Sequence, residues 1–163
     1  MRNIEAIYNE SLEGKYLIFR LIEGVYGINI KDVIQKMSYS DITKIDISDS
    51  PIVGITNTQG TYVPVLDLRK MYGLDEVSCY DDSNVLIVGL SGDYSDILIG
   101  IVVDKVLGIN MLSSNKIVRL NKYDNKIDSK SFSGVAIVRN SITKLLNISR
   151  IMNEIRLSQR EEQ

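Results

Sequence analysis

The apolar residues of this chain recur mostly at every second position or in short continuous runs of β-branched residues, and this spacing limits the fold more than any other feature. Alternation is typical of half-buried strands, and short apolar runs are typical of fully buried strands. We therefore predict a mainly β protein. Each half holds about five short strands with turn-rich connections, which favours barrels or sandwiches over a parallel sheet with crossover helices. No clear repeat is visible at the level of residues.

Turn residues place the expected strands. We predict strands at residues 16–21, 25–30, 42–45, 52–56, 61–66, 85–90, 97–103, 106–111, 133–138 and 142–146. Hairpin turns are expected at Gly24, at residues 57–60 and at residues 139–141. Pro64 lies inside one of these strands, and because proline lacks an amide hydrogen, we expect it at an edge or irregularity of the sheet.

A few helical segments should accompany the strands. Residues 31–37 place apolar side chains at helical spacing over about two turns. Residues 67–73 are typical of a short helix with Asp67 as its N-cap. From Asn147 onwards, apolar residues repeat at i, i+3, i+4 and i+7, which predicts a terminal helix that packs against the sheets. Residues 116–130 are interpreted as a solvated loop, because acidic residues interrupt their cations.

The residue types that the chain lacks exclude most catalytic and metal chemistry. There is no histidine and a single cysteine, Cys79. Imidazole is therefore absent as a general base, metal ligand or phosphate acceptor, and neither an intramolecular disulfide nor a Cys/His zinc site can form. The acidic pair Asp81 and Asp82 lacks the ligand spacing of a calcium loop. We expect no catalytic residues, no metal, no cofactor and a reduced, cytoplasmic setting.

Charge and hydropathy argue against nucleic-acid and membrane partners. The chain has 19 Lys and Arg against 21 Asp and Glu, a formal net charge of −2. Nucleic acids attract basic patches, which this balance does not provide. No apolar run approaches the roughly 18 residues of a membrane span, and glutamates interrupt the start of the chain where a signal peptide would need an apolar core. We expect no nucleic acid partner and no direct membrane insertion.

Residues 52–69, IVGITNTQGTYVPVLDLR, strongly resemble the hallmark segment of the CheW family of chemotaxis coupling proteins. Residues 16–30 resemble the opening hairpin of that family, and residues 100–106 resemble its central strand pair in the second lobe. The resemblance implies a single domain of two SH3-like barrels, each with about five strands. Lobe one is expected at about residues 25–84 and lobe two at about 85–146, with the N-terminal strand and the C-terminal helix packing across both.

The resemblance also implies a function and two sets of contact residues. Family members are non-enzymatic adaptors that link methyl-accepting chemoreceptors to the regulatory domain of the histidine kinase CheA, in membrane-associated arrays that also contain other CheW-like domains. The implied receptor contacts are Val33, Ile34, Gln35, Lys36, Gln59, Gly100, Ile101 and Val102. The implied kinase or array contacts are Gly54, Thr56, Asn57, Gly60, Val85 and Tyr123. For the apolar members, packing in the core is an equally good interpretation.

Two positions depart from the family pattern. Gln35 and Gln59 stand where family members commonly carry glutamate and arginine. Neutral hydrogen bonds are about half as strong as charge-assisted ones, so these changes favour a specialised or accessory coupling protein.

Three alternatives remain open from the sequence. The first is a CheW-like scaffold outside flagellar chemotaxis. The second is a β-barrel that binds peptide, oligosaccharide or single-stranded nucleic acid, which would need aromatic platforms and a basic groove. The third is an enzyme, which would need a cluster of catalytic groups that the sequence does not offer.

Overall fold

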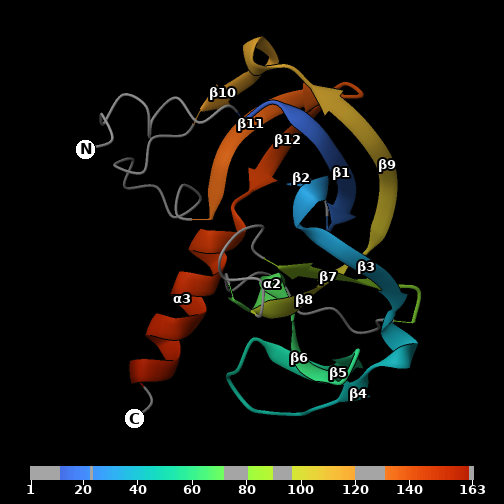
Figure 1. Cartoon of the computed structure of the whole chain (residues 1–163), viewed down its shortest axis with the longest axis vertical. Coiled ribbons are helices and arrows are strands. Elements are labelled where there is room, and N and C mark those ends of the chain that lie inside the picture. Colours follow the sequence, from blue (N-terminus) through green and yellow to red (C-terminus); the bar gives the residue numbers. More distant parts are fainter. Residues whose placement is uncertain (1–11, 23, 72–80, 90–96, 120–130, 162–163) are drawn as a thin grey trace.

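A computed structural model of the chain describes residues 12–22, 24–71, 81–89, 97–119 and 131–161 (Figure 1). The strands are β1 (Gly14–Leu21), β2 (Gly24–Asn29), β3 (Val33–Ser38), β4 (Thr43–Lys44), β5 (Ile52–Thr58), β6 (Thr61–Leu66), β7 (Asn84–Gly89), β8 (Leu98–Val103), β9 (Lys105–Leu112), β10 (Ile117–Arg119), β11 (Phe132–Val138) and β12 (Ser141–Leu146). The helices are the 3₁₀ turns η1 (Ile30–Asp32), η2 (Tyr39–Asp41) and η3 (Ser114–Lys116) and the α-helices α2 (Leu68–Met71) and α3 (Ile148–Glu161).

The strands form two six-stranded sheets, which confirms the mainly β fold of two lobes. Sheet A has the strand order β10-β11-β12-β2-β1-β9, and sheet B has the order β3-β7-β8-β6-β5-β4. Figure 1 shows sheet A above sheet B, with α3 running down one side of the molecule.

The two sheets repeat one topology. Read from its β9 edge, sheet A runs β9-β1-β2-β12-β11-β10, so its strands correspond in turn to β3, β7, β8, β6, β5 and β4 of sheet B. Each sheet has one parallel pair at the same place, β12 with β2 and β6 with β8. The fold is therefore an internal repeat that is not visible at the level of residues.

Neither sheet is a continuous piece of the chain. β1 and β2 belong to sheet A, the chain then builds all of sheet B from β3 to β8, and it returns to sheet A at Asp104 to form β9 to β12. The strands are thus divided differently from the expected lobes at about residues 25–84 and 85–146. β2 lies in sheet A, whereas β7 and β8 lie in sheet B.

The expected helix at residues 31–37 is wrong. Only Ile30–Asp32 form a 3₁₀ turn, and Val33–Ser38 form β3, which pairs antiparallel with β7. β-branched side chains such as Val33 suit a pleated edge strand, and pairing with β7 outweighs the weak helical spacing. The expected helix after Asp67 is present at Leu68–Met71, residues 72–73 lie outside the described part of the chain, and the expected terminal helix is confirmed. The Asp67 carboxylate caps α2 by accepting a hydrogen bond from the Arg69 amide at 2.9 Å, and α3 follows Asn147.

Two further expectations concern irregular segments. Part of the expected loop at residues 116–130 is a strand, because Ile117–Arg119 pair with β11, and residues 120–130 lie outside the described part of the chain. β6 is an inner strand, but its ladder with β8 begins only at Val65. Pro64 pairs with Ile55 in the ladder with β5 and lies just before the first pair of the ladder with β8, where its missing N–H leaves the β8 pairing intact.

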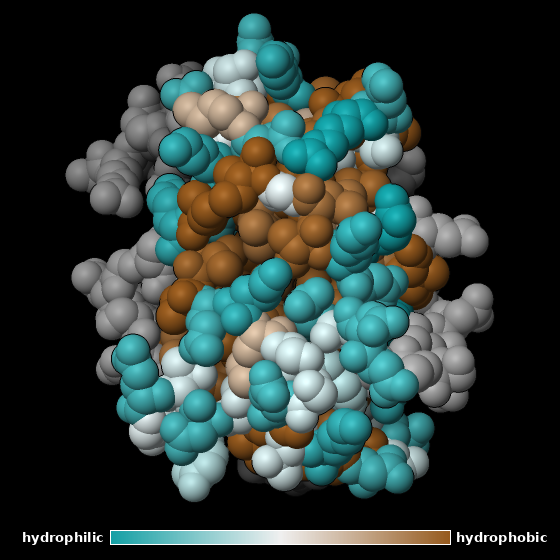
Figure 2. All heavy atoms as spheres, turned by 90° about the vertical axis from the view of Figure 1, so that its right-hand side faces the viewer, coloured by the Kyte–Doolittle hydropathy of each residue, from teal (hydrophilic) through white to brown (hydrophobic). Residues whose placement is uncertain are grey.

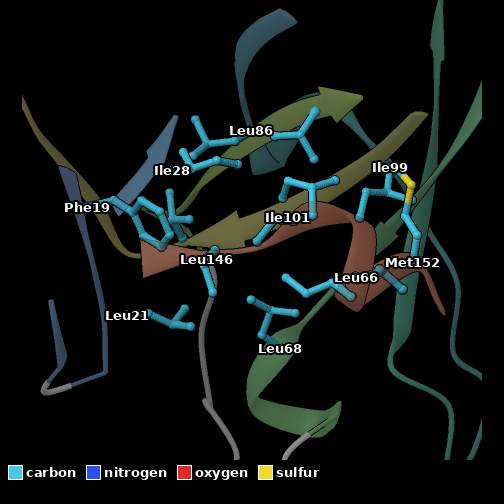
Figure 3. Close-up of a cluster of buried hydrophobic side chains, with 14 of the residues drawn as sticks. Phe19, Leu21, Ile28, Leu66, Leu68, Leu86, Ile99, Ile101, Leu146 and Met152 are labelled. Atoms are coloured by element: carbon cyan, nitrogen blue, oxygen red, sulfur yellow. The ribbon is translucent and has the colours of Figure 1, made fainter. Parts of the chain in front are cut away.

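Buried side chains from both sheets and α3 form one shared core (Figure 3). We use the name shared core for these residues: Phe19, Leu21, Ile28, Leu66, Leu68, Leu86, Val88, Ile99, Ile101, Val103, Phe132, Leu146, Ile148, Ile151 and Met152. A second cluster lies within sheet B around Val63, Val85 and Val102, and a third lies within sheet A around Tyr16, Ile18 and Leu145. The shared core joins the two sheets by non-directional apolar burial.

Candidate partner-binding surfaces

The hairpin of β5 and β6 ends in a two-residue turn. Gln59 and Gly60 have positive φ values of 52° and 84°, the pattern of a type I′ turn that matches the twist of the strands. The Asn57 side-chain oxygen accepts a hydrogen bond from the Gly60 amide at 2.9 Å and so holds the turn. Asn57, Gln59 and Gly60 are exposed, and we call these three residues the hairpin tip.

Most of the other expected kinase or array contacts are buried. Val85 lies in the sheet B core, and Thr56 is buried with its hydroxyl 3.7 Å from the Met37 sulfur. Gly54 is buried against β4, where an added Cβ would lie 2.7 Å from the Thr43 carbonyl oxygen. The side chains of Val85 and Thr56 and the backbone at Gly54 are therefore buried in this structure. Tyr123 lies outside the described residues.

The expected receptor contacts on β3 are mostly accessible. A β-bulge between Val33 and Gln35 leaves Ile34 as the extra residue opposite β7, and its side chain is exposed. Bulges re-aim side chains in this way. Gln35 and Lys36 are also exposed, while Val33 is half-buried and packs against the shared core.

Gly100, Ile101 and Val102, three of the expected receptor contacts, lie in the interior of the fold. Ile101 lies in the shared core with 1% of its surface exposed, and Val102 is fully buried in the sheet B core. An added Cβ at Gly100 would touch the side chains of Val65 and Val85 at 3.0 Å. β8 is an inner strand with both faces covered, so its side chains stabilise the fold and are not presented to a partner.

β9 presents exposed apolar residues that the sequence prediction missed. Ile109 is 52% exposed and Met111 is 66% exposed. Ile109 lies opposite Leu17 of β1, and Leu17 packs against the shared core. β9 and β3 lie on the same side of the molecule in Figure 1, and Figure 2 shows a broad hydrophobic patch across the middle of that side. The signal was present in the sequence, because residues 105–112 are apolar on both faces of an expected strand.

We call the accessible residues of these two edge strands the inter-sheet surface. It comprises Ile34, Gln35 and Lys36 on β3 and Ile109 and Met111 on β9. Only one of the five side chains is charged. Exposed apolar side chains on one side of a domain are typical of a protein-interaction site.

Sheet A carries a second exposed apolar surface on β10, β11 and β12. Val118, Ile137 and Ile142 are all exposed, and Ile137 lies opposite Ile142 in the hairpin. Together with the side chain of Lys116 they line a hollow of about 470 Å³. We call Lys116, Val118, Ile137 and Ile142 the outer face of sheet A.

An ion-pair cluster lies where the two sheets meet, with Arg69 and Asp67 buried and the Asp104 side chain 30% exposed. The Arg69 guanidinium is 1% exposed, and its Nε lies 2.9 Å from Oδ1 of Asp67. Its Nη1 lies 3.0 Å from Oδ1 of Asp104. This cluster is structural in character, because each carboxylate oxygen that faces the guanidinium accepts a hydrogen bond from it.

The part of the chain that the structure describes offers neither a metal site nor a membrane-spanning helix. Within these ranges, no three His, Cys, Asp or Glu side chains are placed to hold a metal ion. No described helix is long and apolar enough to cross a membrane.

Exposed apolar edge strands on a shared, buried core define a β-rich protein-interaction domain. The model of the CheW-like domain matches residues 15–156, so the chain belongs to the CheW-like family, as the sequence resemblance indicated. The chemotaxis protein CheW of Klebsiella aerogenes is 27% identical over 94% of this chain and 90% of its own length. The CheW of Thermotoga maritima is 26% identical over 88% and 90% of the two chains.

A solved structure supports the same assignment. The scaffolding protein TtCheW from Thermoanaerobacter tengcongensis superimposes with a TM-score of 0.69 and 27% identity, over 86% of this chain and 88% of that chain. Fold, family and relatives together support a role as a chemotaxis adaptor.

Proposed function

We propose that this protein is a non-enzymatic adaptor that joins methyl-accepting chemoreceptors to the regulatory domain of the histidine kinase CheA. It acts in the cytoplasm at membrane-associated receptor arrays. The observation that carries the proposal is the inter-sheet surface, where exposed apolar side chains of β3 and β9 are backed by the shared core. A pre-formed apolar surface binds a partner without a large ordering cost.

The receptor is assigned to the inter-sheet surface. Ile34, Gln35 and Lys36 remain from the sequence expectation, Gln59 of the hairpin tip is kept as a further receptor contact, and Ile109 and Met111 are added. Val33 contributes indirectly by packing against the shared core beneath. Because Lys36 is the only charged member, binding should depend on apolar burial more than on ion pairs.

The kinase and neighbouring CheW-like domains are assigned to two other surfaces. The hairpin tip offers exposed polar groups at one end of sheet B, and the outer face of sheet A offers exposed apolar groups. Tyr123 follows β10 in the chain and stays in this proposal as an array contact. Two separate surfaces would allow one adaptor to contact two array neighbours at once.

The test measures affinity for a receptor cytoplasmic fragment and for the kinase regulatory domain by calorimetry. Ile109→Ser should weaken receptor binding about tenfold, or about 1.4 kcal/mol, because it removes buried apolar area. Ile137→Ser, an equally drastic change at an exposed isoleucine of the outer face of sheet A, is the matched control and should leave receptor binding unchanged. Absence of binding to both partners by the unmodified chain would refute the adaptor function.

The second candidate is an accessory coupling protein for a particular receptor class. Gln35 is favoured as its determinant because it is exposed on β3 within the inter-sheet surface. If few ion pairs are present, receptor affinity should change little between about 50 and 300 mM salt, although the Debye length falls from roughly 14 to 6 Å. The double change Gln35→Glu with Gln59→Arg should then favour receptors served by ordinary family members. Steep salt dependence of the unmodified complex would contradict this specialisation.

A further inference from the structure

The chain crosses between the two sheets at two places, and the two crossings are built differently. The first runs through η1 between β2 and β3, and the second is the single residue Asp104 between β8 and β9. Because β2 and β8 are equivalent in the repeated topology, the two crossings are equivalent as well. The ion-pair cluster lies at the second crossing.

Asp104 links the sheets through its two carboxylate oxygens. Oδ1 accepts a hydrogen bond from Arg69, which follows β6 of sheet B, at 3.0 Å. Oδ2 accepts a hydrogen bond from the amide of Ile22, in the β1–β2 turn of sheet A, at 2.6 Å. The Asp104 amide also donates to the Arg20 carbonyl oxygen at 2.9 Å. One side chain therefore holds an element of each sheet.

The backbone at Ile22 shows that this link constrains the fold. Ile22 has a φ of 56°, a left-handed conformation that is costly for a β-branched residue. Such a conformation persists only where surrounding contacts hold it in place. Here the hydrogen bond from the Ile22 amide to the Asp104 carboxylate is such a contact.

The equivalent place in the other half carries different residues. In the two equivalent parallel pairs, Val65 lies opposite Gly100 and Leu145 lies opposite Gly27, so Leu145 is the counterpart of Val65. Counting on from these two residues, Asn147 is the counterpart of Asp67, and Ser149 is the counterpart of Arg69. Asn147 caps its helix through the Arg150 amide. The neighbouring Arg150 donates instead to the Phe132 carbonyl oxygen at 2.7 Å. The same strand order is thus found with a serine at the position of Arg69, which points to a role for the Arg69 ion pairs other than specifying the strand order.

We propose that Arg69 is a positioning residue that fixes the orientation of sheet A relative to sheet B through Asp104, and thereby sets the spacing between β3 and β9. Apolar burial in the shared core is non-directional, whereas charge-assisted hydrogen bonds are directional. β9 begins directly after Asp104, so a change at this residue is transmitted to Ile109 and Met111. The consequence for receptor affinity rests on the proposed function, but the consequence for sheet orientation does not.

The first test uses Asp104→Asn. Arg69 and Ile22 donate to different oxygens of Asp104, and the amide replaces one of these oxygens by an NH2 group, which donates and so faces one of the two donors without accepting from it. Arg69 keeps its pair with Asp67, so no buried charge is left alone. Asp46→Asn makes the same charge change at an exposed site and is the matched control.

Sheet orientation is measured by the distance between two spin labels. The labels are placed at Tyr62→Cys in sheet B and Ile137→Cys in sheet A, both exposed and outside the inter-sheet surface, in a Cys79→Ser background. Asp104→Asn should broaden the distance distribution about twofold, because two orientations of the sheets become populated. Asp46→Asn should reproduce the parent distribution. An unchanged distribution in folded Asp104→Asn overturns the proposal.

Two further measurements complete the test. If Asp104→Asn does not fold, Arg69→Lys is measured in the same way, because one ammonium group lacks the guanidinium fork that spans both carboxylates. An unchanged distribution in Arg69→Lys also overturns the proposal. In the binding measurement, Asp104→Asn should weaken receptor affinity about twofold, because two comparably populated orientations leave about half of the molecules in the binding arrangement. If the unmodified chain binds no receptor, the proposed function fails, while the spin-label distances still decide the role of Arg69.

Discussion

At the scale of single residues, two glycines allow short edge strands to approach the hairpins. An added Cβ at Gly54 would lie 2.7 Å from the Thr43 carbonyl oxygen, and one at Gly134 would lie 2.9 Å from the Val118 carbonyl oxygen. Both glycines follow an irregularity in the first strand of their hairpin. A side chain at either position would push β4 or β10 away.

Gly54→Ala should therefore destabilise the fold. We expect the free energy of unfolding to fall by about 1–3 kcal/mol, the usual effect of overpacking, as measured by urea titration. The control is Gly60→Asn, because Asn140 occupies the equivalent turn position with a φ of 64° and asparagine tolerates that conformation. A Gly54→Ala protein as stable as the parent would contradict the close approach. Partner-binding tests at Gly54 would thus report folding rather than a contact.

Tyr16 gives a prediction about alkaline pH. Burial raises the pKa of its hydroxyl above the ordinary value of 10.0, with Asp32 adding to the rise, while Asn29 and Arg119 oppose it. The folded state then holds the proton more tightly than the unfolded state. Stability is fully present below about pH 10 and is lost as pH rises through the folded pKa. Tyr16→Phe should reduce this alkaline loss in unfolding titrations, whereas Tyr62→Phe, at an exposed site, serves as the control.

The capping role of Asp67 could be predicted from the sequence, but the burial of Arg69 could not. Asp67 precedes a helical segment, and its side-chain oxygen accepts a hydrogen bond from the Arg69 amide, two residues further on. Such a contact between near neighbours can be predicted from the local sequence. Arg69 pairs with Asp104, 35 residues further along the chain. No local pattern identifies such a partner, and a lone arginine is normally exposed.

At the scale of elements, short segments were the hardest to predict. Residues 31–37 are too few for the apolar spacing to distinguish two helical turns from a strand. Their actual structure is set by β7, which offers an edge for pairing. β10 was missed for the same reason, because three residues carry little periodicity. The hairpins were predictable because their turn residues carry local conformational information.

The two equivalent helix caps give a prediction at this scale. Asn147→Ala should cost about 1 kcal/mol, the usual effect of losing an N-cap. Asp67→Ala should cost about 3–5 kcal/mol, because it also leaves the buried Arg69 with a broken ion pair. Urea unfolding of both variants checks the difference. Equal losses at the two caps would mean that the ion pair contributes no more than the cap itself.

At the scale of the whole molecule, the strand-rich fold class was predictable but the pairing of strands between lobes was not. Alternation shows that a segment is a strand, yet it does not say which sheet the strand joins. Here the chain leaves sheet A after β2 and returns at Asp104, so neighbours in sequence lie in different sheets. The inter-sheet surface depends on this exchange, because β3 and β9 each begin just after a crossing.

Because the chain passes from sheet A to sheet B and back, we predict that both lobes unfold together. The shared core takes side chains from both sheets and from α3, so separating the sheets would expose Phe19 and Ile28 of sheet A together with Leu86 and Ile101 of sheet B. The cost of exposing this apolar area couples the two halves. Native-state hydrogen exchange should therefore give equal opening free energies for the most protected amides of β1 and β7.

The same coupling predicts the behaviour of a fragment. Residues 30–103 contain every strand of sheet B in one continuous piece. The isolated fragment should nevertheless lack a cooperative unfolding transition, because its half of the shared core would face water. Circular dichroism during urea titration measures this, with the full chain as control. A cooperative transition in the fragment, or lower opening free energies confined to one sheet in the full chain, would show that the lobes are independent units joined only by their two crossings.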